Sequence, residues 1–293
     1  MRYTYYPGCS LESAAKAYDI SLRTVFRLLG HELNELEDWN CCGSTAYTSV
    51  AETTALAVCA RNLALAEQQG VDLVAPCSAC YTVLNKTDRF LREQPELRSK
   101  VAEALGEAGL SYKGNLRIRH PLDVLMNDVG LDAIALKTTQ RLEGVKVAPY
   151  YGCQIVRPER SFDDREVPML LDEMLSSLGA TVVDYAMKVR CCGGMLMTTV
   201  DDVALKLCSE LLQCAVDSGA DVIATTCPLC QINLEAYQDQ INRRFKTKIR
   251  IPVVFFTQLL GLALGASRAE VALDSQLIPF EPALAPLAEA VHV

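Results

Sequence analysis

Ten cysteines, arranged as two sets of five in the same order, constrain this 293-residue chain more than any other feature. Each set has a lone Cys, then Cys-Cys-Gly, then Cys-x-x-Cys. From the Cys-Cys pair onward every member recurs after 150 residues, and the lone Cys recurs after 144. The first set is Cys9, Cys41, Cys42, Cys77 and Cys80, and the second is Cys153, Cys191, Cys192, Cys227 and Cys230. Such a repeat indicates an internal duplication.

The sequence around the cysteines repeats as well. The segment YYPGC at 5–9 is similar to YYGC at 150–153, apart from the extra Pro7, and GVDLV at 70–74 is similar to GADVI at 219–223. We therefore divide the chain into two similar halves, residues 1–143 and residues 144–293. The second half ends in a proline-containing tail after about Ala266, which we interpret as a packing or docking extension.

Strand-like and helix-like segments alternate in each half. Short apolar runs that suit buried parallel strands lie at 2–6, 72–75, 116–119, 146–151, 221–224 and 252–255. Helical spacing of apolar residues, with Gly30 as the first stop, lies at 11–29, 48–69, 121–126, 201–218 and 258–264. We therefore predict an α/β fold of two similar halves, related by a pseudo-twofold axis. Each half would be a small, mainly parallel sheet flanked by helices. Each Cys-x-x-Cys then falls where a strand ends, the usual place for ligands in such sheets.

Composition excludes several classes of protein. Half of the residues are hydrophobic and 22% are charged, which is unlike a disordered or fibrous chain. A net charge of −8 without a basic run argues against nucleic acid as a partner. The start MRYTYYPGCS lacks the pattern of a signal peptide, and the most apolar stretch, 251–265, is shorter than a membrane span. We expect a cytoplasmic protein that does not itself span a membrane, whose thiols stay reduced and serve metal binding or redox chemistry.

The number of thiols per half indicates the kind of site. Five thiolates exceed the four that one zinc ion or one ordinary iron–sulfur cluster uses. Adjacent cysteines can bind neighbouring irons of an extended cluster, and Gly43 and Gly193 are expected to let the backbone approach it closely. The spacing therefore predicts a polynuclear site in each half. A pair of zinc sites with an idle fifth Cys, or dithiol exchange at Cys-x-x-Cys, remain as alternatives.

The three other cysteines are expected to serve the core. Cys59, Cys208 and Cys214 lie on apolar helical faces, where a free Cys behaves as a small hydrophobe.

The histidines and the basic residues near the cysteines are weaker candidates. His31 and His292 are expected to be exposed. His120, at a strand-to-helix junction, is a possible site residue, although a satisfied structural histidine is favoured. Arg157, Lys188 and Arg190 lie close to cysteines, where they would either bind an anionic substrate group or face solvent. No Ser-His-Asp set, Walker loop or G-x-G-x-x-G supports a hydrolase or nucleotide-binding function.

In these motifs the chain resembles the CCG-domain proteins, the family of the heterodisulfide reductase B subunit and its bacterial relatives. The family pattern of Cys, Cys-Cys-Gly and Cys-x-x-Cys occurs twice, and both copies are complete here. The matching segments extend over nearly the whole chain: YYPGCS at 5–10, DWNCCG at 38–43, ARNLALAE at 60–67, YGCQIVRP at 151–158, CCGG at 191–194, CPLCQ at 227–231 and FTQLLGLALG at 256–265.

The resemblance implies a noncubane [4Fe-4S] cluster in each half, with a disulfide cleaved between the two. Cluster one would take Cys9, Cys41, Cys42, Cys77 and Cys80, and cluster two Cys153, Cys191, Cys192, Cys227 and Cys230. No catalytic residue beyond these ligands is implied, because the cofactor carries the chemistry. Electrons would come from a ferredoxin-like C subunit with [4Fe-4S] clusters and ultimately from a flavin-containing A subunit. The substrate would be a small-molecule or carrier-bound disulfide or thiol. The YYPGCS start favours a bacterial, sulfur-metabolism type.

Two other functions stay open at this point. The chain would also fit a non-catalytic electron-transfer or anchoring subunit of a succinate or fumarate reductase-like complex, which keeps Cys-Cys-Gly motifs. A zinc scaffold is the third class. Two complete cysteine sets favour catalysis, because a substrate disulfide can then be split between two clusters.

Overall fold

The computed structural model describes residues 1–44, 47–158 and 162–280, and in it the chain forms two four-stranded parallel sheets. The first has the order β2-β1-β3-β4 and the second the order β6-β5-β7-β8. The strands are β1 (Arg2–Tyr5), β2 (Glu32–Glu35), β3 (Leu73–Val74), β4 (Ile118–Arg119), β5 (Lys146–Tyr150), β6 (Thr181–Val182), β7 (Val222–Thr225) and β8 (Val253–Phe255). The same order in both sheets confirms the predicted α/β fold with two similar halves.

Helices surround both sheets. Those of the first half are α1 (Gly8–Leu11), α2 (Lys16–Leu29), α3 (Tyr47–Val50), α4 (Glu52–Glu67), α5 (Ser78–Glu93), α6 (Pro95–Glu107), α7 (Pro121–Val124), the π-helix η1 (Leu125–Val129) and α8 (Leu131–Lys137). Those of the second half are α9 (Leu170–Ser177), the 3₁₀-helix η2 (Gly194–Thr198), α10 (Asp201–Asp217), α11 (Pro228–Glu235), α12 (Gln238–Phe245), α13 (Phe256–Ala263) and the 3₁₀-helix η3 (Leu273–Ser275).

The structure refines the predicted elements. The helix expected over 11–29 is interrupted between α1 and α2, and it ends at Gly30, whose φ of +83° is the left-handed conformation of a glycine C-cap. The helix expected over 48–69 is interrupted at Ala51, between α3 and α4. The edge strands β2 and β6 were not predicted. Strand β2, Glu32–Glu35, has three exposed residues and one half-buried residue, so it lacks the apolar run of a buried strand.

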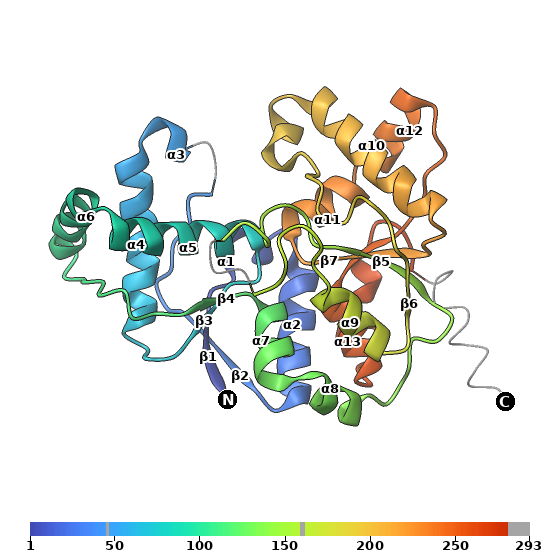
Figure 1. The fold of residues 1–293 in the computed structure, drawn as a ribbon, viewed down its shortest axis with the longest axis horizontal. Coiled ribbons are helices and arrows are strands. Elements are labelled where there is room, and N and C mark those ends of the chain that lie inside the picture. Colours follow the sequence, from blue (N-terminus) through green and yellow to red (C-terminus); the bar gives the residue numbers. More distant parts are fainter. Residues whose placement is uncertain (45–46, 159–161, 281–293) are drawn as a thin grey trace.

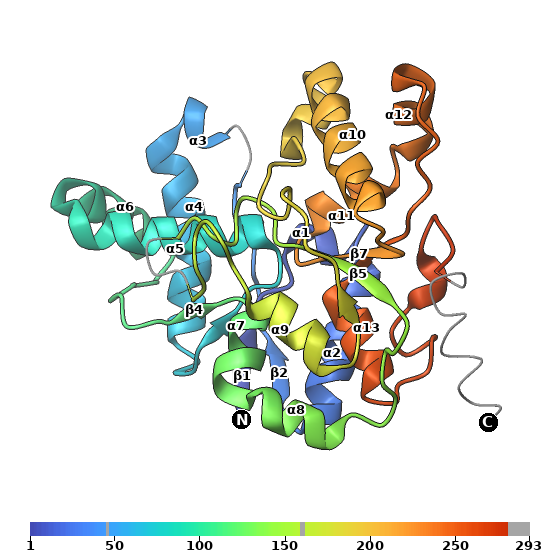
Figure 2. The same ribbon diagram turned by 45° about the vertical axis from the view of Figure 1, so that its right-hand side comes forward.

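The two halves share their largest buried core. Helices α2 and α13, one from each half, lie side by side in both views (Figures 1 and 2), and a 2.7 Å hydrogen bond joins the hydroxyls of Ser21 and Thr257 between them. The surrounding core draws on both halves, with Leu22 and Phe26 from one and Leu259 from the other.

Helix α3 and the start of α10 project on the same side of the molecule (Figures 1 and 2).

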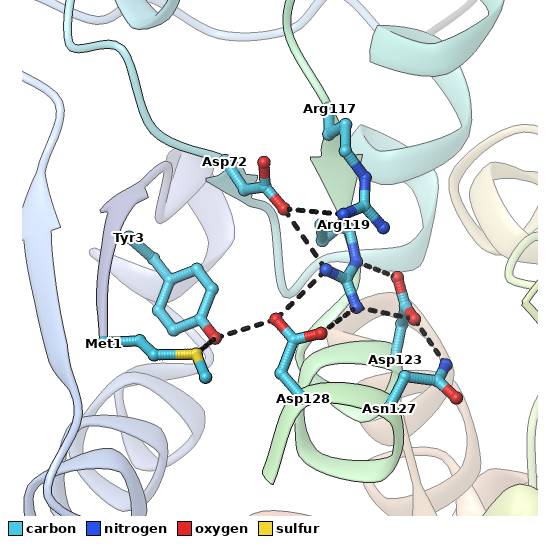
Figure 3. A network of polar contacts seen from close by, with 8 residues as sticks. All are labelled: Met1, Tyr3, Asp72, Arg117, Arg119, Asp123, Asn127 and Asp128. Carbon is cyan, nitrogen blue, oxygen red and sulfur yellow. Dashed lines mark hydrogen bonds and ion pairs between the residues drawn. The ribbon is translucent and has the colours of Figure 1, made fainter.

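A buried ion network fixes the end of β4. The guanidinium of Arg119, which is 3% exposed, contacts the carboxylates of Asp72, Asp123 and Asp128 (Figure 3). Asp123 and Asp128 lie on α7 and η1, so the network ties the strand to the helical segment that follows it. Tyr3 on β1 donates its hydroxyl to Asp128 at 2.9 Å, which adds the central strand to the network.

The structure also bears on what we expected of membrane-spanning helices, of the tail and of two histidines. Within the described residues, no helix has both the length and the apolar character needed to cross a membrane. The described part of the tail packs against the core, with Leu273 and Phe280 buried. Residues 281–293, including His292, lie outside the described residues. His31, expected to be exposed, is half-buried, and its Nδ1 lies 3.0 Å from the N-terminal amino group.

Candidate functional site

The cysteines gather where the carboxyl ends of the central strands meet. In each sheet the chain leaves the two parallel central strands, β1 and β3 or β5 and β7, toward opposite edges of the sheet, and this reversal creates the crevice that usually holds ligands. Cys9 follows β1 and Cys77 follows β3, and Cys153 and Cys227 occupy the same places after β5 and β7. The fold therefore brings each lone Cys beside its Cys-x-x-Cys.

Close contacts between thiols link the members of each set. The Sγ atoms of Cys42 and Cys80 lie 3.2 Å apart, and those of Cys192 and Cys230 lie 3.5 Å apart. The Sγ atoms of Cys9 and Cys41 are separated by 3.9 Å. The contact between the second Cys of Cys-Cys-Gly and the last Cys of Cys-x-x-Cys is thus the same in both halves, as an internal duplication requires.

The two sets also meet each other. The hydroxyl of Ser78, next to Cys77, donates to the carbonyl of Thr226, next to Cys227, at 3.2 Å. The nearby Cys227 thiol raises the pKa of Cys77. The equivalent ligand loops of the two halves therefore lie side by side, as a pseudo-twofold relation of the halves requires.

Burial divides each set in the same way. The second Cys of the pair and both members of Cys-x-x-Cys are buried in each half. The first Cys of the pair, Cys41 or Cys191, is exposed, and the lone Cys is exposed at Cys9 and half-buried at Cys153. Each set thus has a closed inner side and an outer side open to a substrate or a partner.

Hydrogen bonds between thiols lower the pKa of three cysteines in the two Cys-Cys pairs. Hydrogen bonds from Cys41 and then Cys80 lower the pKa of Cys42 to about 4, and a hydrogen bond from Cys153 lowers the pKa of Cys191 to about 6. A hydrogen bond from Cys230 lowers the pKa of Cys192 as well. Because the thiolate is the form that binds metal, these shifts favour Cys42, Cys191 and Cys192 as ligands, whereas the hydrogen bond with Cys42 raises the pKa of Cys41.

Gly8 and Gly152 border ligand thiols although they were not predicted, and the backbone N–H of Gly193, which was, donates to the Sγ of Cys191 at 3.3 Å. A Cβ at Gly8 would lie 3.2 Å from the Sγ of Cys80, and one at Gly152 would lie 3.1 Å from the Sγ of Cys230. A Cβ at Gly193 would instead lie 2.7 Å from the Cβ of Ala204 on α10. Gly8 and Gly152, with φ of +71° and +68°, therefore leave the space beside the sulfur atoms.

The tyrosines before the lone cysteines correct the sequence alignment of the halves. The hydroxyl of Tyr6 donates to the carbonyl of Asn40 at 2.8 Å, and that of Tyr150 donates to the carbonyl of Arg190 at 2.7 Å. Each acceptor immediately precedes the Cys-Cys pair. Tyr6 therefore corresponds to Tyr150, and Tyr151 stands in the place of Pro7, so the segment up to the lone Cys aligns without a gap.

His120 is a satisfied structural histidine, as favoured from the sequence, and it lies at the boundary of the halves. Its Nε2 is 3.0 Å from the carbonyl oxygen of Pro76 and 3.3 Å from that of Thr226, while its Nδ1 accepts from the backbone N–H of Leu122. Complete burial lowers the pKa of His120 to about 4, so the ring is neutral near pH 7.

Sequence reasoning missed two aromatic residues at this boundary. Tyr18 stacks on Phe255, and Phe162 stacks on His120, with ring planes 7° and 10° apart. Tyr18 and Phe162 each lie nine residues after the lone Cys of their half, which is the signal that would have found them.

The other candidate residues divide as follows. Cys59 and Cys208 are buried as predicted, and Cys214 is half-buried. The ammonium group of Lys188 lies 3.1 Å from the Asp172 carboxylate, and the side chain is largely buried, so it is a structural ion pair. Arg190 is exposed and contributes its backbone carbonyl to Tyr150.

Arg157 lines a cavity of about 390 Å³ between the halves. Helix α5 contributes Tyr81, the residue after Cys80, and the second half contributes Arg157, Pro158 and Phe162. Cations outnumber carboxylates in the lining, which comprises Lys86, Arg89, Arg92, Arg117, Arg119 and Arg157 against Asp88 and Asp123. Arg92, Arg117 and Arg119 also contact carboxylates, so a small ligand with an acidic group would meet the exposed Arg157.

The donor set fits an iron–sulfur centre. Soft thiolates are the usual ligands of such clusters, and five of them line one crevice in each half. In the described residues, no three His, Cys, Asp or Glu side chains are arranged to hold a single metal ion. The thiols lie in contacting pairs, and the glycines leave space at the inner sulfur atoms.

Comparison with known proteins gives consistent relatives. The cysteine-rich CCG domain family matches residues 3–85 and 147–235. The chain is 33% identical to a Wolinella succinogenes protein named 8-methylmenaquinol:fumarate reductase membrane anchor subunit, over 94% of this chain and 96% of that protein. It is also 33% identical, over 93% of each chain, to an Archaeoglobus profundus protein whose name likens it to the B subunit of heterodisulfide reductase. Identity is 30%, over 94% of each, to a Methanosarcina acetivorans protein named as the B subunit of ferredoxin/F(420)H(2)-dependent CoB-CoM heterodisulfide reductase.

Among solved structures, a hypothetical protein from Helicobacter pylori has the same fold. The TM-score is 0.78 over 95% of this chain, at 16% sequence identity. This chain spans about half of that protein, 52% of its length.

Proposed function

The chain belongs to the cysteine-rich CCG domain family as a relative of the heterodisulfide reductase B subunit, and from this we infer that it is an iron–sulfur oxidoreductase subunit that reduces a disulfide. In the reverse direction it would oxidise two thiols. The names of its relatives support a place in an oxidoreductase complex. That this subunit carries the catalytic site, as a heterodisulfide reductase-like enzyme, is our proposal.

One observation carries the proposal: the loops that carry Cys77 and Cys227, equivalent members of the two complete cysteine sets, lie side by side, with Ser78 donating to the carbonyl of Thr226 at 3.2 Å. We assign Cys9, Cys41, Cys42, Cys77 and Cys80 to one noncubane [4Fe-4S] cluster and Cys153, Cys191, Cys192, Cys227 and Cys230 to another. A site between the sets would place each sulfur of a substrate disulfide beside one of them. A relay subunit would not need two complete sets side by side.

The chemistry divides between cofactor and protein. When bound, iron–sulfur clusters supply the two electrons that, with two protons, convert one disulfide into two thiols. The buried Cys-x-x-Cys segments exclude water from the inner side of the site. The exposed Cys41 and Cys191 mark the sides on which substrate or partner can approach.

The cavity beside Arg157 supports a substrate that carries an acidic group. A carboxylate, sulfonate or phosphate would gain charge-assisted hydrogen bonds from the basic side chains of its lining. This supports a small-molecule or carrier-bound disulfide or thiol as the substrate.

The proposed partners follow from the electron supply. All ten repeated cysteines are assigned to the two clusters, so the electrons must come from elsewhere. We propose a ferredoxin-like C subunit with [4Fe-4S] clusters and a flavin-containing A subunit, in a cytoplasmic complex of the sulfur-metabolism type. Residues 1–143 and 144–293 would form the first and second CCG domains, the second with its tail.

The first test is the iron and acid-labile sulfide content of protein purified without oxygen. About eight of each per chain is expected for two four-iron clusters. About four would leave one half empty and favour a relay role. Zinc with little iron would overturn the oxidoreductase function.

The Wolinella relative, named a membrane anchor subunit, supports a second candidate function. In that case the chain would pass electrons or anchor a fumarate or succinate reductase-like complex without binding a disulfide. Titration with a disulfide, followed by EPR, separates the two candidates. A spectral change on adding disulfide to the isolated chain supports catalysis, and an unchanged spectrum supports the relay.

A further inference from the structure

One histidine side chain reaches the ligand loops of both halves. The Nε2 of His120 lies 3.0 Å from the carbonyl oxygen of Pro76 and 3.3 Å from that of Thr226. These two residues directly precede Cys77 and Cys227, so they occupy equivalent positions in the two cysteine sets. A single imidazole therefore bridges the two peptide groups that directly precede Cys77 and Cys227.

The hydrogen bonds of the ring define its role. Because the N–H of Leu122 points at Nδ1 over 3.2 Å, Nδ1 is the acceptor and Nε2 carries the proton. The Nε2–H then donates to the two carbonyls. With both nitrogens committed to backbone groups, His120 has no nitrogen left to exchange protons with a substrate. Its contribution is to position the two loops.

The ring itself is held from two sides. Phe162 of the second half stacks on it with ring centroids 6.2 Å apart. On the other side the preceding residue, Arg119, is fixed by the carboxylates of Asp72, Asp123 and Asp128 (Figure 3). Since strand β4 ends at Arg119, this network sets the direction in which His120 leaves the sheet.

The bridge is asymmetric although the fold is duplicated. Strand register places Phe255 where His120 stands in the first half, and a phenyl ring donates no hydrogen bond. The Thr226 carbonyl also accepts from the hydroxyls of Tyr18 at 3.3 Å and Ser78 at 3.2 Å, so all three donors come from the first half. The first half thus holds the second through the loop that carries Cys227.

We propose that His120 is the positioning residue that fixes the Cys77 and Cys227 loops relative to each other and thereby sets the electronic coupling between the two metal centres. The electronic coupling rests on the proposed function, because it requires both clusters. The hydrogen bonds of His120 do not require them, so they can be tested in the metal-free chain as well.

The first test compares three variants as the metal-loaded full chain. H120F matches the residue of the other half and removes the donor, whereas H120Q keeps amide N–H donors near the same carbonyls. H31F is the matched control, because His31 contacts Met1, Tyr3 and Phe26 rather than a ligand loop. The readouts are iron per chain and the spin–spin splitting in EPR, in a redox state in which both clusters are paramagnetic.

We expect H120F to retain its iron but to lose the splitting, and H120Q and H31F to keep it. Wild-type splitting in H120F with full iron would overturn the proposal. An equal loss in H120F and H120Q would overturn it too, since the donor would then not be what matters. If the wild-type chain holds no cluster, the proposed function fails and the second test alone decides the geometry.

The second test uses the metal-free full chain. Diamide takes two electrons and two protons from a pair of thiols and leaves a disulfide, which peptide mass mapping locates. We expect a Cys77–Cys227 disulfide in the wild type, in H120Q and in H31F, and a several-fold lower yield in H120F. An unchanged yield in H120F, or no such disulfide in the wild type, would contradict the positioning role.

Discussion

The ring of Tyr18 lies flat against that of Phe255, with centroids 4.4 Å apart and ring planes 7° apart. The two residues come from different halves of the chain, and both are buried. The Tyr18 hydroxyl also reaches the carbonyl of Thr226, beside a proposed cluster ligand. The boundary between the halves is therefore an internal core, and we expect the chain to unfold as one unit.

Replacing Tyr18 with Ala should lower the free energy of unfolding by about 3–5 kcal/mol, because it removes a large buried ring and a hydrogen bond from this core. Urea denaturation followed by circular dichroism measures the change. Leu136→Ala is the control, since Leu136 is 88% exposed and should change stability by less than about 0.5 kcal/mol. Two separate unfolding transitions in the wild type would show that the halves are independent.

Replacing Cys192 with Ser should remove one proposed cluster. The Cys192 thiol lies 3.5 Å from that of Cys230 at the buried side of the second set, and the hydrogen bond from Cys230 lowers its pKa, which favours the thiolate that binds metal. We expect iron and acid-labile sulfide to fall by about half, from about eight to about four per chain. Metal analysis of anaerobically purified protein measures both.

The control for this ligand is Cys214→Ser rather than Cys208→Ser. Cys214 is half-buried and outside both sets, whereas the Cys208 thiol donates to the backbone carbonyl of Cys192 at 3.2 Å. Cys214→Ser should keep the iron content of the wild type. Full iron in Cys192→Ser, with an unchanged absorption spectrum, would refute the ligand assignment.

Arg119→Met should destabilise the chain by about 3 kcal/mol, because it leaves the carboxylates of Asp123 and Asp128 without their buried partner. Arg117→Met is the matched control. Arg117 contacts Asp72 at 3.5 Å but is 69% exposed, so its loss should cost less than about 1 kcal/mol. Equal losses from both variants would show that burial does not decide the strength of this network.

The same network predicts a pH dependence. Burial acts to raise the pKa of Asp128, but hydrogen bonds from Arg119 and Tyr3 outweigh it and hold the pKa below the usual 3.8. A depressed folded-state pKa stabilises the protein above the pKa of the unfolded chain, and this stability is lost as the pH falls below about 4. The difference between wild type and Arg119→Met should therefore shrink below about pH 4 in urea titrations. A constant difference from pH 7 to pH 3 would contradict it.

Arg157→Gln should raise the KM for an acidic disulfide about fivefold, the effect of about 1 kcal/mol at an exposed cation, and leave kcat unchanged. The reason is that Arg157 lines the basic cavity without belonging to either cysteine set. Steady-state kinetics with one acidic and one neutral disulfide measure the effect. Arg250→Gln, an exposed change outside the cavity lining, is the control. An equal effect on both disulfides would exclude a charge interaction.

Much of the fold and of the ligand set was predictable because its signals are local. Buried parallel strands are short apolar runs, so the sequence predicted β1, β3, β4, β5, β7 and β8, but the polar edge strand β2 left no such run. That Gly43 and Gly193 let the backbone approach a cluster stays a prediction, and the backbone N–H of Gly193 does donate to the Sγ of Cys191 at 3.3 Å. Gly8 and Gly152, which lie against the Sγ atoms of Cys80 and Cys230, were not predicted.

By itself the sequence determined the duplication, the two sets of five cysteines, the α/β class and the family, because residue order and spacing are properties of the chain alone. Only the tertiary structure decided which groups touch. The hydrogen bond from Ser78 to Thr226, and the bridge from His120 to Thr226, join residues more than 100 positions apart. Such contacts depend on how the carboxyl ends of two sheets meet, and that arrangement is set by the shared core and not by any local pattern.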